Sequence, residues 1–239
     1  EIQKIYPQEE SQLADVWSKY MPSDRYDCGN IDFCNDGDKL HSIKTLEDFM
    51  SEKILLIDGH SILNRAFYGL PDLTNSEGKH TGAVYGFLNI LLRTIEEEKP
   101  QYLTVAFDLK APTFRHKMFE AYKGTRKPMP EELREQVPLI KEMLTAMGVN
   151  VVTKEGYEAD DILGTLARKS EAAGMDATIL SGDRDLLQLA TDKVMIRLPK
   201  TVRGKTTIED YHAQQVIEKY QVTPPQIIEL KALMGDSAD

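Results

Sequence analysis

The fold is decided by a short apolar stretch, Ile54-Leu55-Leu56-Ile57-Asp58-Gly59. Four consecutive aliphatic residues are typical of a strand buried on both faces, as in a parallel sheet, and Asp58-Gly59 ends the run with turn-forming residues. Apolar residues then recur at helical spacing in Ile62, Leu63, Ala66 and Phe67. A buried strand followed at once by an amphipathic helix predicts the first unit of an α/β fold.

The same alternation continues along the chain. We expect further strands at residues 102–107, 149–152 and 177–180, and helices at about 83–98, at about 131–147 and after Asp185. Strands interleaved with helices predict a mostly parallel sheet with helices on both faces. Residues 50–221 would form this α/β domain.

Acidic residues follow several of the predicted strands. Asp58 and Asp108 come directly after strands, and Asp183 and Asp185 follow the strand at 177–180. Each alone is explained as a helix cap or a turn former. Because the carboxyl ends of parallel strands meet at one edge of a sheet, where ligands bind, we expect all of them at one rim. Their conjunction therefore favours a binding site.

The densest acidic run is Gly156-Tyr157-Glu158-Ala159-Asp160-Asp161, at the head of a helical pattern. One interpretation is ordinary capping, since acids in the first turn offset the helix dipole. However, Glu158 and Asp161 share a helical face with Asp160 beside them, and like charges held so close raise one another's pKa unless a cation lies between them. A hard divalent ion, Mg²⁺ or Mn²⁺, is the natural candidate.

Composition narrows the class of protein. The 239 residues suffice for a sizeable core, and no apolar run of about 18 residues or charged-then-apolar leader is present, so we expect a cytoplasmic protein without membrane attachment. The net charge of −10 argues at first against nucleic-acid binding. Residues 1–49, however, hold 11 acidic against 5 basic groups, and bound divalent cations would offset much of the remainder.

Residues 1–49 differ from the rest of the chain. They contain both cysteines, Cys28 and Cys34, and no sustained apolar period, which predicts a low-order N-terminal extension. Met50 directly precedes the first strand and is a candidate start, so that residues 1–49 would be upstream readthrough. An appended module is the alternative.

A basic segment at residues 110–127 is the counterpart of the acids. It carries six lysines and arginines against the single acid Glu120, with Phe114, Phe119 and Tyr122 interleaved. Cations beside aromatic platforms suit single-stranded nucleic acid, because phosphates meet the charges and bases stack on the rings. A solvated basic helix is the alternative.

Five motifs occur in the order of one nuclease family. They are Leu56-Ile57-Asp58-Gly59, Ala106-Phe107-Asp108, Glu158-Ala159-Asp160-Asp161, Ser181-Gly182-Asp183-Arg184-Asp185 and Leu233-Met234-Gly235-Asp236-Ser237-Ala238-Asp239. Over about residues 53–239 the chain resembles the 5′→3′ exonuclease region of bacterial DNA polymerase I, a relative of flap endonucleases. The resemblance implies a PIN- or resolvase-like 5′ nuclease fold, with residues 110–134 as a helical arch. Residues 222–239 would begin a helix-hairpin-helix module that grips duplex DNA.

The resemblance also implies roles for individual residues. Two Mg²⁺ or Mn²⁺ ions would be bound, the first by Asp58, Asp108, Glu158, Asp160 and Asp161, and the second by Asp183, Asp185, Asp236 and Asp239. Catalysis would further use Lys123 and Arg126 at the scissile phosphate, Tyr122 at the terminal base, and Arg65 at another phosphate.

The implied activity is metal-dependent cleavage of DNA in replication and repair. The substrates would have 5′ ends or flaps, including RNA-primed strands, and the protein would act as a monomer. The alternatives are a PIN-type ribonuclease and a catalytically silent DNA-binding fragment.

Overall fold

The computed structural model describes residues 52–124, 126–202 and 205–235. The predictions for residues 1–49, for a start at Met50, and for Asp236 and Asp239 lie outside these residues.

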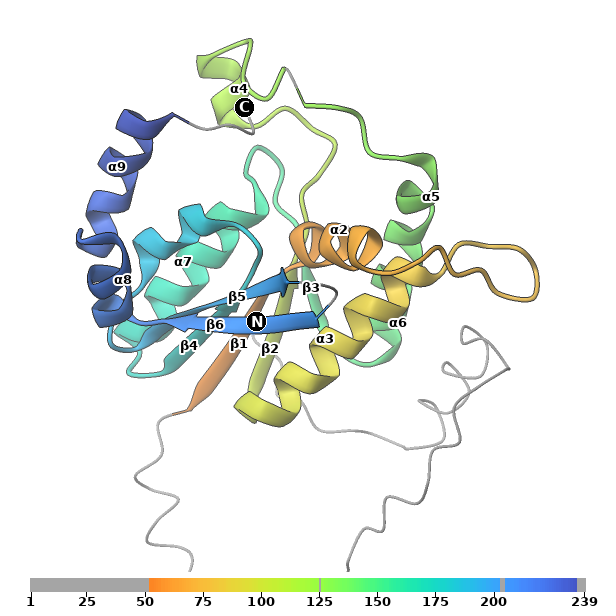
Figure 1. The fold of residues 1–239 in the computed structure, drawn as a ribbon, viewed down its shortest axis with the longest axis horizontal. Helices are drawn as coiled ribbons and strands as arrows, with labels where there is room; N and C mark the ends of the chain where they lie inside the picture. Colours follow the sequence, from red (N-terminus) through yellow and green to blue (C-terminus); the bar gives the residue numbers. More distant parts are fainter. Residues whose placement is uncertain (1–51, 125, 203–204, 236–239) are drawn as a thin grey trace, which may run out of the picture.

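A six-stranded sheet forms the centre of the molecule, in the order β3-β2-β1-β4-β5-β6 (Figure 1). All neighbouring strands are parallel except β5 and β6, which are antiparallel. The mostly parallel sheet is therefore confirmed. The strands are β1 (Lys53–Asp58), β2 (Tyr102–Ala106), β3 (Asn150–Val152), β4 (Asp176–Leu180), β5 (Val194–Val202) and β6 (Lys205–Tyr211).

Helices cover both faces, as predicted (Figure 1). On one face lie α2 (Gly59–Gly69), α3 (Gly82–Glu98) and α6 (Gln136–Ala146). The other face is covered by α7 (Ala159–Ala172), η2 (Arg184–Leu189) and α8 (Ala213–Tyr220). Remaining elements are α4 (Phe114–Met118), α5 (Glu131–Arg134), η3 (Pro224–Gln226) and α9 (Ile227–Met234).

Alternate side chains of β1 pack into the cores on the two faces of the sheet. Leu55 and Ile57 pack into the cluster of α2, α3 and α6, while Ile54 and Leu56 pack into the cluster of α7 and η2. All four are fully buried. Successive side chains of a strand point to opposite faces, so a continuous apolar run supplies both layers at once.

The glycine at position 59 allows the end of β2 to pack closely against the start of α2. A Cβ atom there would lie 2.5 Å from the ring of Phe107, which follows β2. This close approach holds the start of α2 against the end of β2, and so keeps Asp58 and Asp108 near the same rim.

Two local predictions were wrong in detail, and one pair of strands was missed. The helix expected at 131–147 is divided into α5 and α6 at Glu135, whose backbone stays helical, and the helix expected after Asp185 is the 3₁₀ helix η2. The β5–β6 hairpin was not predicted. Pro199 obscures the strand pattern there, but it is tolerated because it pairs only with β6, beyond the end of β4.

Residues 110–134 are not a continuous helical arch in the part that the structure describes. They contain α4, a series of turns from Phe119 to Gly124, an extended stretch and α5. Pro128 and Pro130 disfavour helix before them, and Gly124 adds a flexible position. Figure 1 shows this segment, green, crossing above the rim of the sheet.

A buried arginine holds the β5–β6 hairpin to the rest of the sheet. Arg197 is only 6% exposed, donates to both oxygens of Asp210 at 2.8 and 2.9 Å, and reaches Glu97 and Glu98 at the end of α3, both at 2.9 Å. Because its charge is matched by acids on two other elements, the network fixes the position of β6 against α3.

At the C-terminal side, Ile227 of α9 is buried in the cluster under α7 and η2. Residues 222–235 therefore pack on the α/β domain, and their assignment to a helix-hairpin-helix module stays a prediction. No helix among the described residues is long and apolar enough to cross a membrane.

Candidate active site

The candidate active site is a cleft at the topological switch point of the sheet. The chain runs from β1 to β2 on one side, and later returns to β4 on the other side of β1, so the connections diverge between β1 and β4. Open α/β sheets bind ligands at such a point, outside the carboxyl ends of the strands. A cleft of about 1240 Å³ opens there, which suits a segment of a polymer better than one small molecule.

Most of the predicted site residues line this cleft. Among the acids they are Asp58, Asp108, Glu158, Asp160, Asp183 and Asp185, and among the others Tyr122, Lys123 and Arg126. The predicted gathering of acids at one rim is thus observed. Asp161 and Arg65 do not line the cleft.

Asp58 is both a helix cap and part of the acidic rim. Its Oδ1 accepts from the Ser61 amide at 3.0 Å, which caps α2, and its Oδ2 accepts from the Ser181 hydroxyl at 2.9 Å. Burial raises the pKa of Asp58 to about 6, although these two hydrogen bonds favour the charged form. The capping explanation and the binding-site explanation are therefore compatible at this residue.

Asp108 is held by two elements. Its Oδ1 accepts from the Ala159 amide at the start of α7 at 2.7 Å, and its Oδ2 lies 3.5 Å from His60 Nδ1. Burial opposes the charged form, but the contacts with His60 and Ala159 outweigh it and lower the pKa of Asp108. His60 also lines the cleft and was not among the predicted site residues; its position directly after Asp58-Gly59 at a strand end is the signal that could have placed it there.

Asp160 lies where its charged form is strongly disfavoured. Burial, followed by the negative charges of Asp58, Asp183 and Asp108, raises its pKa to about 8. Its Oδ1 is buried and has no hydrogen-bond partner within the described part of the chain. A buried oxygen without a donor, surrounded by carboxylates, is what a cation would satisfy.

Basic and aromatic side chains of residues 110–127 contact the remaining acids of α7. Lys123 donates to Glu158 Oε1 at 2.9 Å, and the Tyr122 hydroxyl donates to Oε2 of the same carboxylate at 3.3 Å. Arg115 binds both oxygens of Asp161 at 2.8 Å, while Asp161 Oδ2 also accepts from the Glu158 amide at 3.0 Å. Asp161 thus joins the basic segment to α7 and caps this helix, and its pKa is lowered chiefly by Arg115.

The acids after β4 occupy the other side of the cleft. Asp183 caps η2 by accepting from the Asp185 amide at 2.8 Å, and Asp185 Oδ1 lies 2.8 Å from Lys231 of α9. The Gly182 amide donates to the Ser61 hydroxyl at 2.8 Å, which fixes this loop to α2. The contribution of Lys231 was missed, because a single lysine in an apolar helix gives no local signal.

Arg65 is placed differently from the other predicted catalytic cations. It lines a pocket of about 220 Å³ between α2, α3 and the β5–β6 hairpin. A Cβ atom on Gly182 would lie 3.6 Å from its guanidinium, so Arg65 stands behind the loop that carries Asp183.

Within the described residues, no three histidine, cysteine or acidic side chains are close enough together to share one metal ion. The physical reason is visible in the contacts: like charges repel one another, and Lys123 and Arg115 occupy the oxygens of Glu158 and Asp161. The donor set still fits a hard divalent cation, because it consists of carboxylates and includes the unpartnered Oδ1 of Asp160. Inward rotation of these side chains would be needed.

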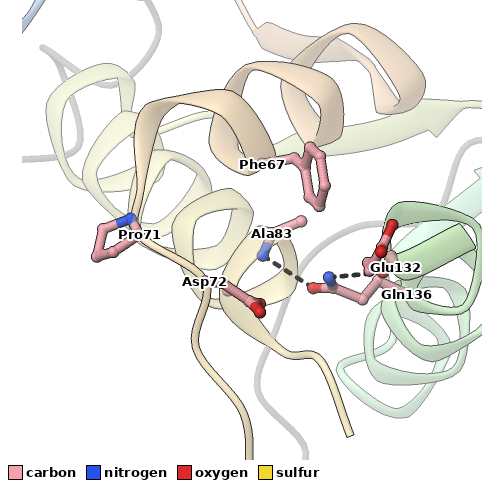
Figure 2. Close-up of a pocket in the computed structure, with 7 residues that line it drawn as sticks. Phe67, Pro71, Asp72, Ala83, Glu132 and Gln136 are labelled. Carbon is pink, nitrogen blue, oxygen red and sulfur yellow. Dashed lines mark hydrogen bonds between the residues drawn. The ribbon is translucent and has the colours of Figure 1, made fainter. Parts of the chain in front are cut away.

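A third pocket, of about 310 Å³, lies between α2, α3, α5 and α6 (Figure 2). Figure 2 shows the Gln136 side chain reaching Ala83 at the start of α3. Its oxygen accepts from the Ala83 and Val84 amides at 2.8 and 3.1 Å, and its nitrogen donates to the Glu132 carbonyl at 2.9 Å. Gln136 thereby caps α3, and none of the predicted site residues lines this pocket.

A cleft at the switch point of a parallel sheet, lined by both carboxylates and cations, is typical of α/β enzymes that hydrolyse phosphate esters with divalent metal ions. Within that class, the chain belongs to the family of 5′-3′ exonuclease N-terminal, resolvase-like domains. The model of this family matches residues 53–221. The resemblance inferred from the five motifs is thus confirmed.

A curated relative supports the same assignment. The chain is 50% identical over 188 residues to DNA polymerase I of Bacillus subtilis, covering 79% of this chain and 21% of the relative. The chain therefore spans about a fifth of the length of the curated relatives it matches.

Solved structures share the fold. The T5 D15 protein, co-crystallized with metal ions, superimposes with a TM-score of 0.60 at 23% identity, covering 79% of this chain and 68% of that one. The bacteriophage T5 D15 flap endonuclease in a pseudo-enzyme-product complex with DNA and metal ions gives a TM-score of 0.58 at 22% identity over the same shares. At this identity the likeness establishes the fold, which confirms the PIN-like 5′ nuclease architecture.

Proposed function

We propose that this chain is the 5′ nuclease part of a DNA polymerase I, acting in the cytoplasm as a monomer on DNA with 5′ ends or flaps, including RNA-primed strands. The observation that carries the proposal is Asp160, a buried carboxylate with an unpartnered oxygen among the other acids of the cleft. Family membership and the T5 flap endonuclease bound to DNA and metal ions support the same reading.

The predicted acidic ligands would hold two Mg²⁺ or Mn²⁺ ions, with Asp58, Asp108, Glu158, Asp160 and Asp161 at one and Asp183, Asp185, Asp236 and Asp239 at the other. When bound, such ions lower the pKa of a water and stabilise the charge of an in-line phosphoryl displacement. The chain's own part is to hold these carboxylates in place: Ser61 and Ser181 orient Asp58, and the Ala159 amide orients Asp108. The Arg115–Asp161 pair keeps the basic segment next to them.

Lys123 is the cation best placed to move from the protein to the substrate. Its ammonium is 2.9 Å from Glu158 Oε1, at the mouth of the cleft. A bound phosphate offers a second anionic partner at the same place, so Lys123 would transfer from Glu158 to the phosphate as the carboxylate turns inward. Arg126 lines the same mouth, and Tyr122 presents a ring there. Arg65 would have to contact a phosphate from the far side of the loop that carries Asp183, because it does not line the cleft.

The test is cleavage of a duplex with a 5′-labelled flap, in Mg²⁺ and in EDTA, beside a matched single-stranded RNA. We expect cutting of the DNA flap in Mg²⁺ alone, and its loss in Asp160→Asn. Cutting of the RNA in preference to the flap would instead support a PIN-type ribonuclease. Binding of the flap without cleavage in Mg²⁺ or Mn²⁺ would mean a catalytically silent DNA-binding fragment.

A further inference from the structure

Two aromatic side chains stand exposed beside the cleft and have no role in the chemistry described above. Phe114, the first residue of α4, is 40% exposed, and Tyr157, in the loop before α7, is 49% exposed. Their rings contact each other, with centroids 5.9 Å apart and a tilt of 56°. Two exposed rings that adjoin each other form contiguous apolar surface, which marks a binding site more than singly exposed residues do.

The pair is held in place by the backbone and by a cation. The Phe114 amide donates to the Gly156 carbonyl at 3.0 Å, which joins the two loops, and Gly156 adopts a φ of +81° that favours glycine. The Arg115 guanidinium lies over the Phe114 ring at 4.5 Å and is itself fixed by Asp161. One face of Phe114 is therefore taken, and Tyr157 supplies the accessible surface.

The position of the pair relates it to the nucleic acid. Tyr157 directly precedes Glu158, and Phe114 directly precedes Arg115, and both Glu158 and Arg115 line the cleft. The nearby exposed side chains of the same segment include Lys117 and Phe119. A ring platform edged by cations at the mouth of a phosphate-binding cleft fits a single-stranded nucleic acid, whose bases stack while its phosphates meet the charges.

We propose that Tyr157, backed by Phe114, stacks with an unpaired nucleobase of the single-stranded 5′ portion of the substrate, outside the position assigned to Tyr122. The proposal rests on the proposed function, since it concerns the strand that enters the same cleft. It adds a contact that would favour substrates with a flap over those with a flush nick. The position of the pair favours this occupant over a protein, because Arg115 both covers the Phe114 ring and lines the cleft that would hold the phosphates of the same strand.

The experiment measures binding in Ca²⁺, which should prevent cleavage, with three probes: a duplex carrying a ten-nucleotide oligothymidine flap, the same duplex with abasic flap residues, and a flush nicked duplex. Tyr157→Ala should bind the oligothymidine flap about 5- to 150-fold more weakly, the range for losing one stacked ring. It should bind the other two probes as the wild type does. Tyr157→Phe should restore affinity, because the ring suffices.

The matched control is Tyr68→Ala, since Tyr68 is 72% exposed on α2 and does not line the cleft. Equal effects of Tyr157→Ala and Tyr68→Ala on flap binding would overturn the stacking proposal, and are expected if the rings contact a protein instead. An equal loss of affinity for the flush nicked duplex would also overturn it, because that probe has no unpaired base to stack. Cleavage of the flap by the wild type in Mg²⁺ separates this result from failure of the proposed function, which would abolish cleavage altogether.

Discussion

Neutralising Asp160 should abolish cleavage and at the same time stabilise the metal-free protein. The folded chain holds the pKa of Asp160 at about 8, because of burial and of the neighbouring charges of Asp58, Asp183 and Asp108. The pKa is near 3.9 in an unfolded chain. The folded state therefore binds this proton more tightly, so the wild type must lose stability as the pH rises from about 4 to about 8.

The size of the effect follows from the same pKa difference. Each pH unit between the two pKa values removes about 1.4 kcal/mol from the free energy of unfolding, which sets an upper limit of about 5 kcal/mol at pH 8. Solvent and mobile side chains relax around a charge at the wall of an open cleft, so we expect about 2 kcal/mol. Asp160→Asn removes the charge, and should exceed the wild type in stability by that amount at pH 8 but only slightly near pH 4.

Urea unfolding followed by circular dichroism, at pH 4.5, 6 and 8 in EDTA, measures this difference. Asp192→Asn is the control, because Asp192 is exposed in the loop before β5 and does not line the cleft. Millimolar Mg²⁺ should then stabilise the wild type at pH 8 and stabilise Asp160→Asn much less, because a ligand that binds the folded state more weakly stabilises it less.

Two results would refute this reasoning. One is an Asp160→Asn protein that is no more stable than the wild type at pH 8, which would mean that the acids of the cleft do not repel one another. The other is an equal gain from Mg²⁺ in both proteins, which would remove Asp160 from the metal site.

Three further predictions follow from other contacts. Lys123→Ala should slow single-turnover cleavage of a flap by about 10²- to 10³-fold while weakening binding in Ca²⁺ only modestly, whereas Lys117→Ala should affect binding alone; equal small losses in both would make the segment merely a basic surface. Gly59→Ala should lower the free energy of unfolding by about 1–3 kcal/mol, because the new Cβ would lie 2.5 Å from the Phe107 ring; urea unfolding measures it, and an unchanged midpoint would show that the ring moves aside without cost. Arg197→Met should destabilise the protein by about 1–3 kcal/mol, since it removes the buried cation that joins Asp210 to Glu97 and to the nearly buried side chain of Glu98; calorimetry checks this, and a melting temperature within a degree of the wild type would contradict it.

The rim of acids could be predicted from the sequence because the inference needs only local patterns and one rule of topology. Asp58 and Asp108 follow apolar runs whose length and flanking turns identify strands, and parallel strands end at a common edge. The order of five short motifs was enough to identify the family. The assignments of individual acids as metal ligands remain predictions, both for those in the cleft and for those beyond residue 235.

The partners of these side chains were decided by the tertiary structure. Arg115 and Asp161 are 46 positions apart, and Lys123 and Glu158 are 35 apart, so no spacing rule connects them. Nothing local distinguishes Arg65, behind the Asp183 loop, from the cations at the cleft mouth. The physical reason is that an apolar period reports which face of an element is buried. An ion pair depends instead on how two elements pack and on which cation they bring within reach of a carboxylate.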